Sequence, residues 1–312
     1  MLTSIIICTC NRADSLAQTL ESLKSINVPE DLPAELILVD NASTDHTAEV
    51  VKSIHLPNMP TRYVYESRRG QVHARNTGIT KASGEIILFT DDDVRPPLNW
   101  ICGMSGPILS GKGSAVAGGV RLASHLERPW MTRLHRAMLA STEGIARNSP
   151  AYFIGANMAF SRQVLSKVPS FDPELGPGAL GVCDDALFAS QIVEAGYEIA
   201  GALDVEVEHH FQKSRLLRSS FESTAIKLGQ SLAYMTYHWR HQSISFPRLR
   251  LFIANIKLKC TNTSGQRYHD EEGIGLQRLQ VLVDVSFYEH YIRERSRPAN
   301  YTKHGLVKLR NG

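Results

Sequence analysis

The sequence predicts an α/β fold with a mostly parallel sheet, followed by a mainly helical C-terminal region. In the first half of the 312 residues, short apolar segments alternate with segments whose apolar residues recur at helical spacing. Such alternation is typical of parallel sheets flanked by helices. Acidic residues also follow two of the strand-like segments, at Asp40 and at Asp91. Because ligands of such sheets bind beyond the carboxyl ends of the strands, both positions predict one site.

Four strands and three helices are expected within the first 90 residues. The strand patterns cover 4–10, 35–39, 61–65 and 85–90. The helical patterns cover 13–23, 45–54 and 71–81. Short polar side chains accept the free N–H groups of a first helical turn. We therefore expect Asn11 to start the first helix and Ser43 or Thr44 to cap the second.

The middle of the chain changes character, and the last third is helical and basic. Further strand patterns cover 114–122, 152–160 and 200–207. Residues 126–147 have a pattern of helix or loop, and the glycine-rich run 176–181 predicts an irregular loop. Asp184 and Asp185 then begin an amphipathic helix. We expect a sheet-containing domain at 1–211 and a helical extension at 212–312.

Composition argues against several classes of protein. The formal net charge of +3 is too small for a dedicated nucleic-acid-binding protein. No apolar stretch approaches the ~20 residues of a membrane span, and the N-terminus lacks a signal-peptide pattern. The five cysteines show no paired C-x-x-C spacing, as expected for reduced thiols. We expect a cytoplasmic protein, with peripheral contact at the inner membrane face as an alternative.

Three consecutive aspartates, Asp91, Asp92 and Asp93, follow the fourth predicted strand. Their like charges repel and raise one another's pKa. A divalent cation relieves that cost, and carboxylates suit Mn²⁺ or Mg²⁺, which often share their ligands with substrate phosphates. A solvated turn is the alternative, but the apolar strand before the triplet favours a metal–diphosphate site.

Two further pairs, one of aspartates and one of histidines, each have two possible interpretations. Asp184-Asp185 fits an ordinary helix N-terminus, where acidic residues are favourable, and fits a general base equally well. His209 and His210 end a strand, where they are structural residues or contacts to a metal or phosphate. Two interpretations are also open for Arg68, Arg69 and Arg75, which suit phosphate recognition and also fit a solvated charged face.

Taken together, seven segments resemble glycosyltransferase family 2, the inverting enzymes with a GT-A-type fold. The resemblance covers about residues 3–211. The segments are S-I-I-I-C-T-C-N-R at 4–12, L-V-D-N-A-S-T-D at 38–45, A-R-N-T-G-I at 74–79, L-F-T-D-D-D at 88–93, G-A-N-M-A-F at 155–160, F-D-P-E-L at 171–175, and D-D at 184–185 before A-G-Y at 195–197. Each motif alone is weak, but their order and spacing make the signal specific.

The resemblance implies roles for individual residues. By that resemblance Asp93 binds the metal, Asp91 contacts the ribose or the metal, and Asp185 is the general base. Asp184 stands beside it where the family has glutamate, so the division of roles in the pair stays open. The remaining implied contacts are Asp40, Arg75, Thr9, Asn11, Arg12 and Asp92 for the nucleotide sugar, Gly155 and Asn157 for the acceptor side, and His209 for the metal.

The resemblance implies metal-dependent, inverting transfer of a sugar from a nucleoside-diphosphate sugar to an acceptor hydroxyl. UDP is the expected nucleotide, and the acceptor is a glycan or a lipid-linked molecule in glycan or polysaccharide biosynthesis. The Q-x-x-R-W motif of processive members does not occur, which favours a single transfer per encounter. Alternatives are a phosphohydrolase that uses the strand-terminal D-x-D, a nucleotidyltransferase and a non-catalytic sugar-binding module. We expect the C-terminal region to form a helical cover over the acceptor site. Peripheral contact with anionic lipid is the alternative interpretation.

Overall fold

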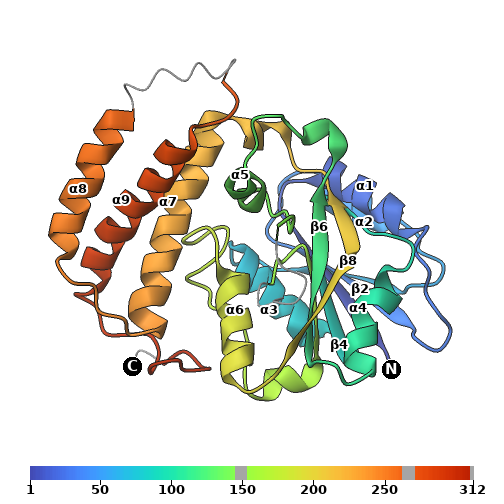
Figure 1. Ribbon diagram of the computed structural model, residues 1–312. Coiled ribbons are helices and arrows are strands. Elements are labelled where there is room, and N and C mark those ends of the chain that lie inside the picture. Colours follow the sequence, from blue (N-terminus) through green and yellow to red (C-terminus); the bar gives the residue numbers. More distant parts are fainter. Residues whose placement is uncertain (145–152, 262–270, 310–312) are drawn as a thin grey trace.

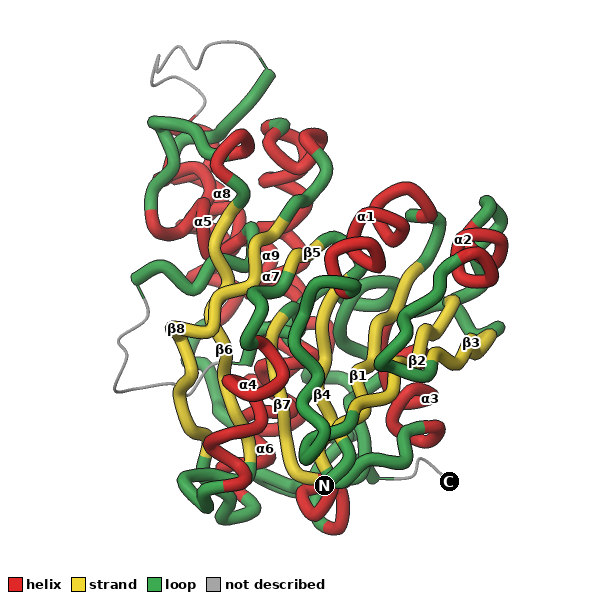
Figure 2. Tube along the Cα trace, turned by 90° about the vertical axis from the view of Figure 1, so that its right-hand side faces the viewer, coloured by secondary structure: helices red, strands yellow, loops and turns green. Residues whose placement is uncertain are grey.

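A computed structural model describes residues 1–144, 153–261 and 271–309 (Figure 1). An eight-stranded sheet runs through it in the order β3-β2-β1-β4-β7-β6-β8-β5, most of which is visible in Figure 2. The strands are β1 (Thr3–Thr9), β2 (Ala34–Asp40), β3 (Thr61–Tyr65), β4 (Ile86–Asp91), β5 (Val94–Arg95), β6 (Ala115–Leu122), β7 (Asn157–Ser161) and β8 (Ile199–His209).

The sheet is mixed and mostly parallel, which confirms the predicted fold class. β1 pairs in parallel with β2 and β4, whereas β7 runs antiparallel to β4 and β6. Thr9 lies opposite Asp40, and Cys8 lies opposite Asp91. The carboxyl ends of three neighbouring strands therefore meet at one edge, where the acidic motifs were expected.

Helices cover both faces of the sheet, and the buried side chains of β1 point alternately to these two faces. Ile5 and Ile7 face one hydrophobic cluster, and Ile6 faces the other. The first cluster packs against α1 (Ala13–Leu23), α2 (Thr47–Ser53) and α4 (Trp100–Leu109). The second packs against α3 (Gln71–Lys81) and α6 (Asp184–Glu194).

Both expected helix caps are wrong, because one aspartate serves both helices. The Asp45 carboxylate accepts the Ala13 N–H of α1 at 3.0 Å and the Thr47 N–H of α2 at 3.2 Å. Asn11 instead has a φ of 53° and accepts the Thr44 N–H at 2.7 Å. The two loops after β1 and β2 are thus tied together beside the site.

Two elements in the middle differ from the sequence pattern. Helix α4 was not predicted, because glycine and proline lower its helix propensity. Gly103 lets it lie close to the sheet, since a Cβ there would stand 2.5 Å from Val205. Within 126–147, the described part forms the short helix α5 (Arg133–Met138), and 145–147 lie outside the described residues. Tyr152 of the expected strand 152–160 also lies outside them, and the observed strand begins at Asn157.

The C-terminal region is helical, as predicted. It contains α7 (Arg218–Tyr234), a π-helical turn (Met235–Trp239), α8 (Pro247–Thr261) and α9 (Leu276–Glu294). Helix α9 packs between α7 and α8, and α8 lies farthest from the sheet (Figure 1). Phe221 and Leu279 share a cluster with Leu122 at the end of β6. The boundary at 211/212 stays a prediction. Among the described residues, no helix is long and apolar enough to cross a membrane.

Candidate active site

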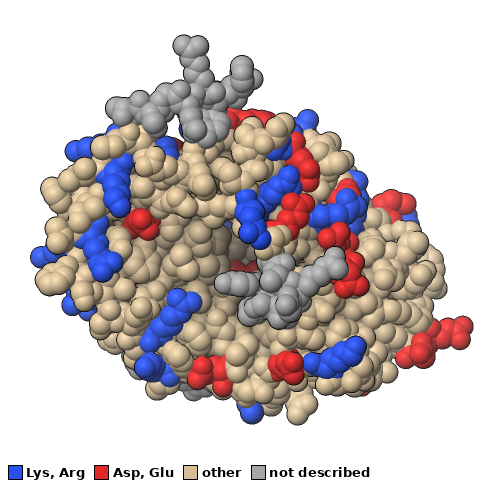
Figure 3. Space-filling model, in the orientation of Figure 1, with Lys and Arg blue, Asp and Glu red and all other residues tan. Residues whose placement is uncertain are grey.

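A cleft of about 620 Å³ opens at the carboxyl ends of β1 and β4. Figure 3 shows the surface hollowed near the centre of the face that it presents. Of the predicted site residues, the cleft is lined by Thr9, Arg12, Asp91, Asp92, Asp93 and His209. Outside its lining are Asn11, Asp40, Arg75, Gly155, Asn157, Asp184 and Asp185. The structure therefore gathers the acidic triplet in the cleft and leaves the acidic pair beside it.

Arg12 and Thr9 hold the second and third aspartates of the triplet. Arg12 Nη1 lies 2.9 Å from Asp92 Oδ1, and its Nη2 pairs with Asp93. Thr9 Oγ1 donates to Asp92 Oδ2 at 2.7 Å. Thr9 is buried, whereas the Arg12 side chain is 29% exposed. Thr9 thus positions the acidic loop, and Arg12 both positions it and faces the cleft.

Asp91 is less tightly paired than its two neighbours. Its Oδ1 lies 3.7 Å from Arg75 Nη2 and accepts a long 3.4 Å hydrogen bond from Gln71. Burial raises the pKa of Asp91, and the charge of Arg75 only partly offsets that rise. A cation in the cleft beside Asp91 would favour its ionised form.

Burial and charge act differently on Asp92 and Asp93. Burial raises the pKa of Asp92 to about 7, against the opposing charge of Arg12. Burial would also raise the pKa of Asp93, but the hydrogen bond from His209 and the charge of Arg12 hold it well below its usual value. Of the three aspartates in the triplet, Asp93 is therefore the one that stays ionised most readily.

His209, at the end of β8, presents one ring nitrogen to Asp93. Its Nδ1 lies 2.9 Å from the Leu139 carbonyl oxygen, which fixes the ring orientation. Its Nε2 lies 3.3 Å from Asp93 Oδ2. His209 and Asp93 are thus in direct contact at the cleft.

The donor set fits a divalent cation that shares its coordination shell with a substrate. No three His, Cys, Asp or Glu side chains in the described part of the chain are arranged to hold an ion by themselves. Mg²⁺ and similar ions commonly take one or two carboxylates and complete their shell with phosphate oxygens and water. Asp91 and Asp93, with His209 beside them, supply that kind of partial set.

Arg75 connects the triplet to the acidic pair. It is 4% exposed, and its guanidinium pairs with Asp184 while lying 3.7 Å from Asp91. A Cβ on Gly155 would stand 1.9 Å from Arg75 Nη2, so glycine is required at that position. Arg75 does not line the cleft, and its contact with the nucleotide stays a prediction. Its role in the structure is to neutralise buried carboxylates.

Asp184 and Asp185 differ in their surroundings, although both lie in the first turn of α6. Asp184 is buried and paired with Arg75. Asp185 is half-buried, and its Oδ2 accepts the Gly155 N–H at 2.9 Å. Burial and the charge of Asp184 raise the pKa of Asp185 to about 6. A raised pKa near neutrality suits a group that takes up a proton.

Asp40 and Asn11 are engaged within the protein. Asp40 is 3% exposed, accepts the Tyr63 hydroxyl at 2.6 Å and accepts the Ser43 N–H at 2.9 Å. Asn11 is bonded to the neighbouring loop rather than to the cleft. Asn41, which follows Asp40, does line the cleft and accepts the Gly70 N–H at 2.8 Å.

Asn157, which was expected on the acceptor side, has a fully buried side chain, and its contact with an acceptor stays a prediction. Trp100 Nε1 donates to its Oδ1 at 2.9 Å. Its Nδ2 donates to the carbonyl oxygens of Gly119 and Val205, each at 2.8 Å. Asn157 therefore joins α4 to β6 and β8, and Gly155 is the member of this segment that touches the acidic pair.

Sequence reasoning missed the cleft residues that follow β8. Arg215 Nη2 donates to the Met138 carbonyl oxygen at 3.3 Å, and its Nη1 lies 3.5 Å from His209 Nε2. Within the described ranges, Arg215 forms no ion pair with a carboxylate, and burial lowers its pKa. Thr224 and Lys227 of α7 also line the cleft. No local pattern identifies Thr224 and Lys227, which reach the cleft through the packing of α7. Arg215 instead stands in the short turn after β8, in the run Q-K-S-R-L at 212–216, which differs from Q-x-x-R-W in its last residue.

Comparison with known proteins agrees with this geometry. Residues 4–168, more than half of the chain, match the family model described as glycosyl transferase family 2. The glycosyltransferase AglE of Haloferax volcanii is 27% identical over 207 residues, which cover 65% of this chain and 64% of that protein. The succinoglycan biosynthesis protein ExoM of Rhizobium meliloti is 31% identical over 117 residues, 37% of each chain. The chain thus spans less than two thirds of the length of these curated relatives.

Solved structures support the fold. The mannosyltransferase PcManGT of Pyrobaculum calidifontis, in complex with GDP-Man and Mn²⁺, is 26% identical with a TM-score of 0.56, over 74% of this chain and 61% of that chain. Residues 1–349 of S. aureus TarS are 16% identical with a TM-score of 0.53, over 97% and 93% of the two chains. These likenesses confirm the GT-A-type fold that the motifs implied. The motifs occur in the expected order, and the family model matches more than half of the chain. The chain therefore belongs to glycosyltransferase family 2.

Proposed function

We propose that the protein is a metal-dependent, inverting glycosyltransferase that moves a sugar from a nucleoside-diphosphate sugar to an acceptor hydroxyl. The observation that supports this best is the arrangement of two acidic groups around Arg75. A triplet that suits a metal and diphosphate lies on one side, and a half-buried carboxylate with a raised pKa lies on the other. A transferase needs both, since one group must hold the leaving group and another must accept a proton.

The diphosphate end of the donor would lie in the cleft beside the triplet. Mn²⁺ or Mg²⁺, held there by Asp91 and Asp93 with His209, would neutralise the diphosphate leaving group. Arg215 and Lys227 add positive charge to the same cleft. A guanidinium without a carboxylate partner suits a phosphate oxygen.

The chemical step is a direct displacement at the anomeric carbon. Asp185 takes the proton from the acceptor hydroxyl as the acceptor oxygen forms its bond to that carbon. The bond from the same carbon to the diphosphate oxygen breaks, and its electron pair leaves with the nucleoside diphosphate. Asp184, neutralised by Arg75, holds Arg75 in place and raises the pKa of Asp185.

Donor and acceptor remain part of the proposal. The GDP-Man in the related mannosyltransferase supports a nucleoside-diphosphate sugar, and UDP is the nucleotide that we expect for this chain. The acceptor would be a glycan or a lipid-linked molecule, as the polysaccharide-related name of ExoM suggests. The absence of Q-x-x-R-W supports a single transfer per encounter.

A thermal-shift screen of UDP-, GDP- and dTDP-sugars with and without Mn²⁺ tests the donor site. A ligand that binds only the folded protein raises the melting temperature. We expect Mn²⁺-dependent stabilisation by one nucleotide class, lost in Asp93→Ala and kept in Asp204→Ala, a matched acidic control on the exposed surface of β8. No response to any donor, together with phosphate release from simple esters, would favour the phosphohydrolase instead.

A further inference from the structure

The outer face of α8 carries an apolar stripe that nothing in the described residues covers. The exposed fractions are 55% for Leu249, 63% for Phe252, 43% for Ile253 and 48% for Ile256. These positions follow the spacing i, i+3, i+4, i+7, so their side chains share one helical face. Phe246, just before the helix, is 78% exposed. An exposed contiguous apolar patch of this kind marks a surface that binds something.

The opposite face of α8 already has its partner. Leu251, Ala254 and Leu258 pack against Val281 and Val285 of α9. These contacts account for the inward side of the helix. The outward stripe is therefore a second apolar face and is not needed to hold α8 on the protein.

Basic residues border the stripe on both sides. Arg248 and Lys259 lie eleven residues apart, and Arg250 and Lys257 lie seven apart, which places one pair along each edge. None of these four forms an ion pair within the described parts of the chain, and α8 contains no acidic residue. In Figure 3 several Lys and Arg side chains, with few acidic ones, occupy the part of the surface where Figure 1 places α8 and α9.

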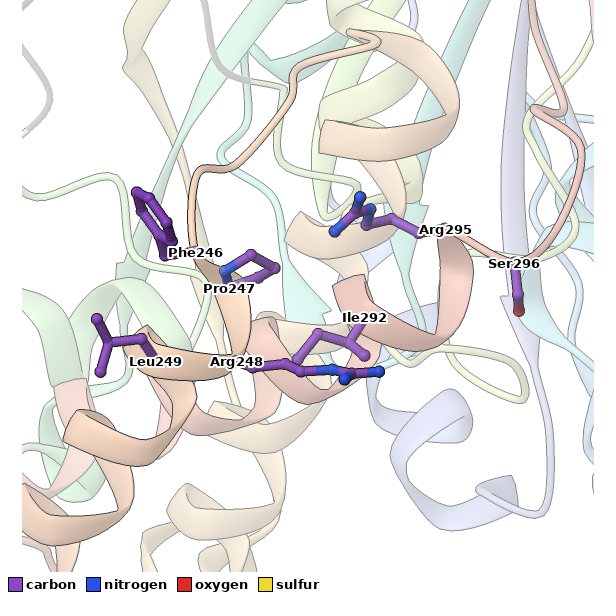
Figure 4. A pocket seen from close by; sticks show the side chains of 7 residues that line it. All are labelled: Phe246, Pro247, Arg248, Leu249, Ile292, Arg295 and Ser296. Atoms are coloured by element: carbon purple, nitrogen blue, oxygen red, sulfur yellow. The ribbon is translucent and has the colours of Figure 1, made fainter.

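A groove at the start of α8 continues this surface. It has a volume of about 640 Å³ and lies between the beginning of α8 and the end of α9. Figure 4 shows apolar Phe246 and Leu249 at one side of the groove. The guanidinium groups of Arg248 and Arg295 lie farther along it, that of Arg248 beside Ile292. Arginines next to apolar side chains suit the boundary between lipid headgroups and acyl chains.

We propose that the outer face of α8 docks in the plane of an anionic lipid bilayer. The stripe would enter the headgroup–acyl boundary, and the bordering cations would contact the lipid phosphates. Charge decides between this occupant and a second copy of the chain, because two identical basic borders repel each other whereas an anionic surface attracts them. The docking itself does not depend on the transferase activity. Its use in reaching a lipid-linked acceptor rests on the proposed function.

Flotation of the full-length protein with lipid vesicles, without any donor or metal, tests the docking. We expect binding to vesicles of phosphatidylcholine with phosphatidylglycerol, much weaker binding to phosphatidylcholine alone, and weakening at about 1 M salt, where the screening length is about 3 Å. Leu249→Ser/Phe252→Ser should lower the bound fraction at least about tenfold. Arg248→Gln/Lys259→Gln should lower it about fivefold per cation.

Matched variants on the other half of the molecule control for hydrophobicity and charge. Leu98→Ser/Leu109→Ser and Lys52→Gln/Lys112→Gln change exposed residues far from α8 and should bind vesicles like the unaltered protein. Equal binding by the α8 variants would overturn the proposal. So would a concentration-dependent dimer, seen by sedimentation, that the stripe substitutions abolish while vesicles bind nothing. Because the flotation experiment contains no donor, a negative result there would leave the thermal-shift test of the donor site unaffected.

Discussion

At the scale of single residues, adjacent aspartates acquire different chemistry from their surroundings. Asp184 pairs directly with Arg75, whereas Asp185 accepts two backbone N–H groups and lies beside the like charge of Asp184, which the charge of Arg75 only partly offsets. The open division of roles in this pair thus receives a physical basis. The carboxylate with the raised pKa is also the more exposed one.

The first prediction concerns pH. Asp185 accepts a proton only when ionised, and its pKa is about 6. The value of kcat/KM should therefore fall about tenfold per pH unit below pH 6 and level off above pH 7. The sign for stability is the opposite, because the pKa of Asp185 is raised from 3.8 to about 6 in the folded protein. The stability that Asp185 contributes is therefore full below pH 3.8 and is lost as the pH rises to about 6. A pH–rate profile without an acid limb near 6 would contradict the assignment.

The second prediction concerns Asn157. Asn157→Ala leaves the Trp100 N–H and two buried carbonyl oxygens without their partner. We expect the free energy of unfolding to drop by roughly 2–4 kcal/mol, measured by urea denaturation. The KM for the acceptor should stay unchanged at a temperature where the variant is folded. A specific rise in that KM would support the acceptor-side role.

At the scale of elements, the sequence predicts what depends on local pattern. The strands that deliver Asp40 and Asp91, and the helix that begins at Asp184, follow from apolar periodicity and were found where expected. Helix α4 was missed because its stability comes from packing on the sheet and not from propensity. The buried contacts of Asn157 were missed for a related reason. Its three hydrogen-bond partners lie on other elements, and only the fold brings them together.

The same limit explains why the basic residues of the cleft were missed. Arg215 stands in a short turn after β8, and Lys227 lies on α7, so neither belongs to a motif around the triplet. Lys227 reaches the cleft through the packing of α7 against the sheet-containing half, and Arg215 reaches it from the turn that follows β8. Sequence reasoning finds acidic clusters that are contiguous, and it cannot find cations that tertiary structure adds.

The third prediction follows from that packing. Arg215→Gln removes a cation beside His209 and should weaken donor binding about tenfold, as expected for a lost hydrogen bond to a charged phosphate. Titration calorimetry with the donor found in the screen measures this. Lys213→Gln, an exposed neighbour that does not line the cleft, is the control and should bind the donor normally. Unchanged affinity in Arg215→Gln would exclude it from the donor site.

At the scale of the whole molecule, the C-terminal region packs against the sheet-containing half at several places, and two of them bear on the site. One is the cleft itself. The other is Asp172, which accepts the hydroxyls of Tyr234 at 2.5 Å and Tyr301 at 2.8 Å and pairs with Lys308 at 2.9 Å. In the sequence, Asp172 lies between β7 and the loop before α6. The last helices and the chain end therefore support the segment that leads to Asp185.

These connections give the C-terminal region two separate tasks. Helix α7 lines the cleft, and α8 turns an apolar basic face outward. The expected cover over the acceptor site stays a prediction. The two interpretations of this region thus concern different helices. Substitutions on the outer face of α8 should leave transfer to a soluble acceptor unchanged.

The most direct test of the account is the anomeric configuration and rate of product formation, followed by proton NMR with the donor that the screen identifies. From an α-linked donor and a metal ion, the unaltered protein should form the β-linked product. Asp185→Asn should form it about a thousandfold more slowly, with unchanged affinity for the donor. A product that keeps the α configuration, or transfer at the normal rate by a folded Asp185→Asn protein, would contradict the proposed inverting mechanism and its base.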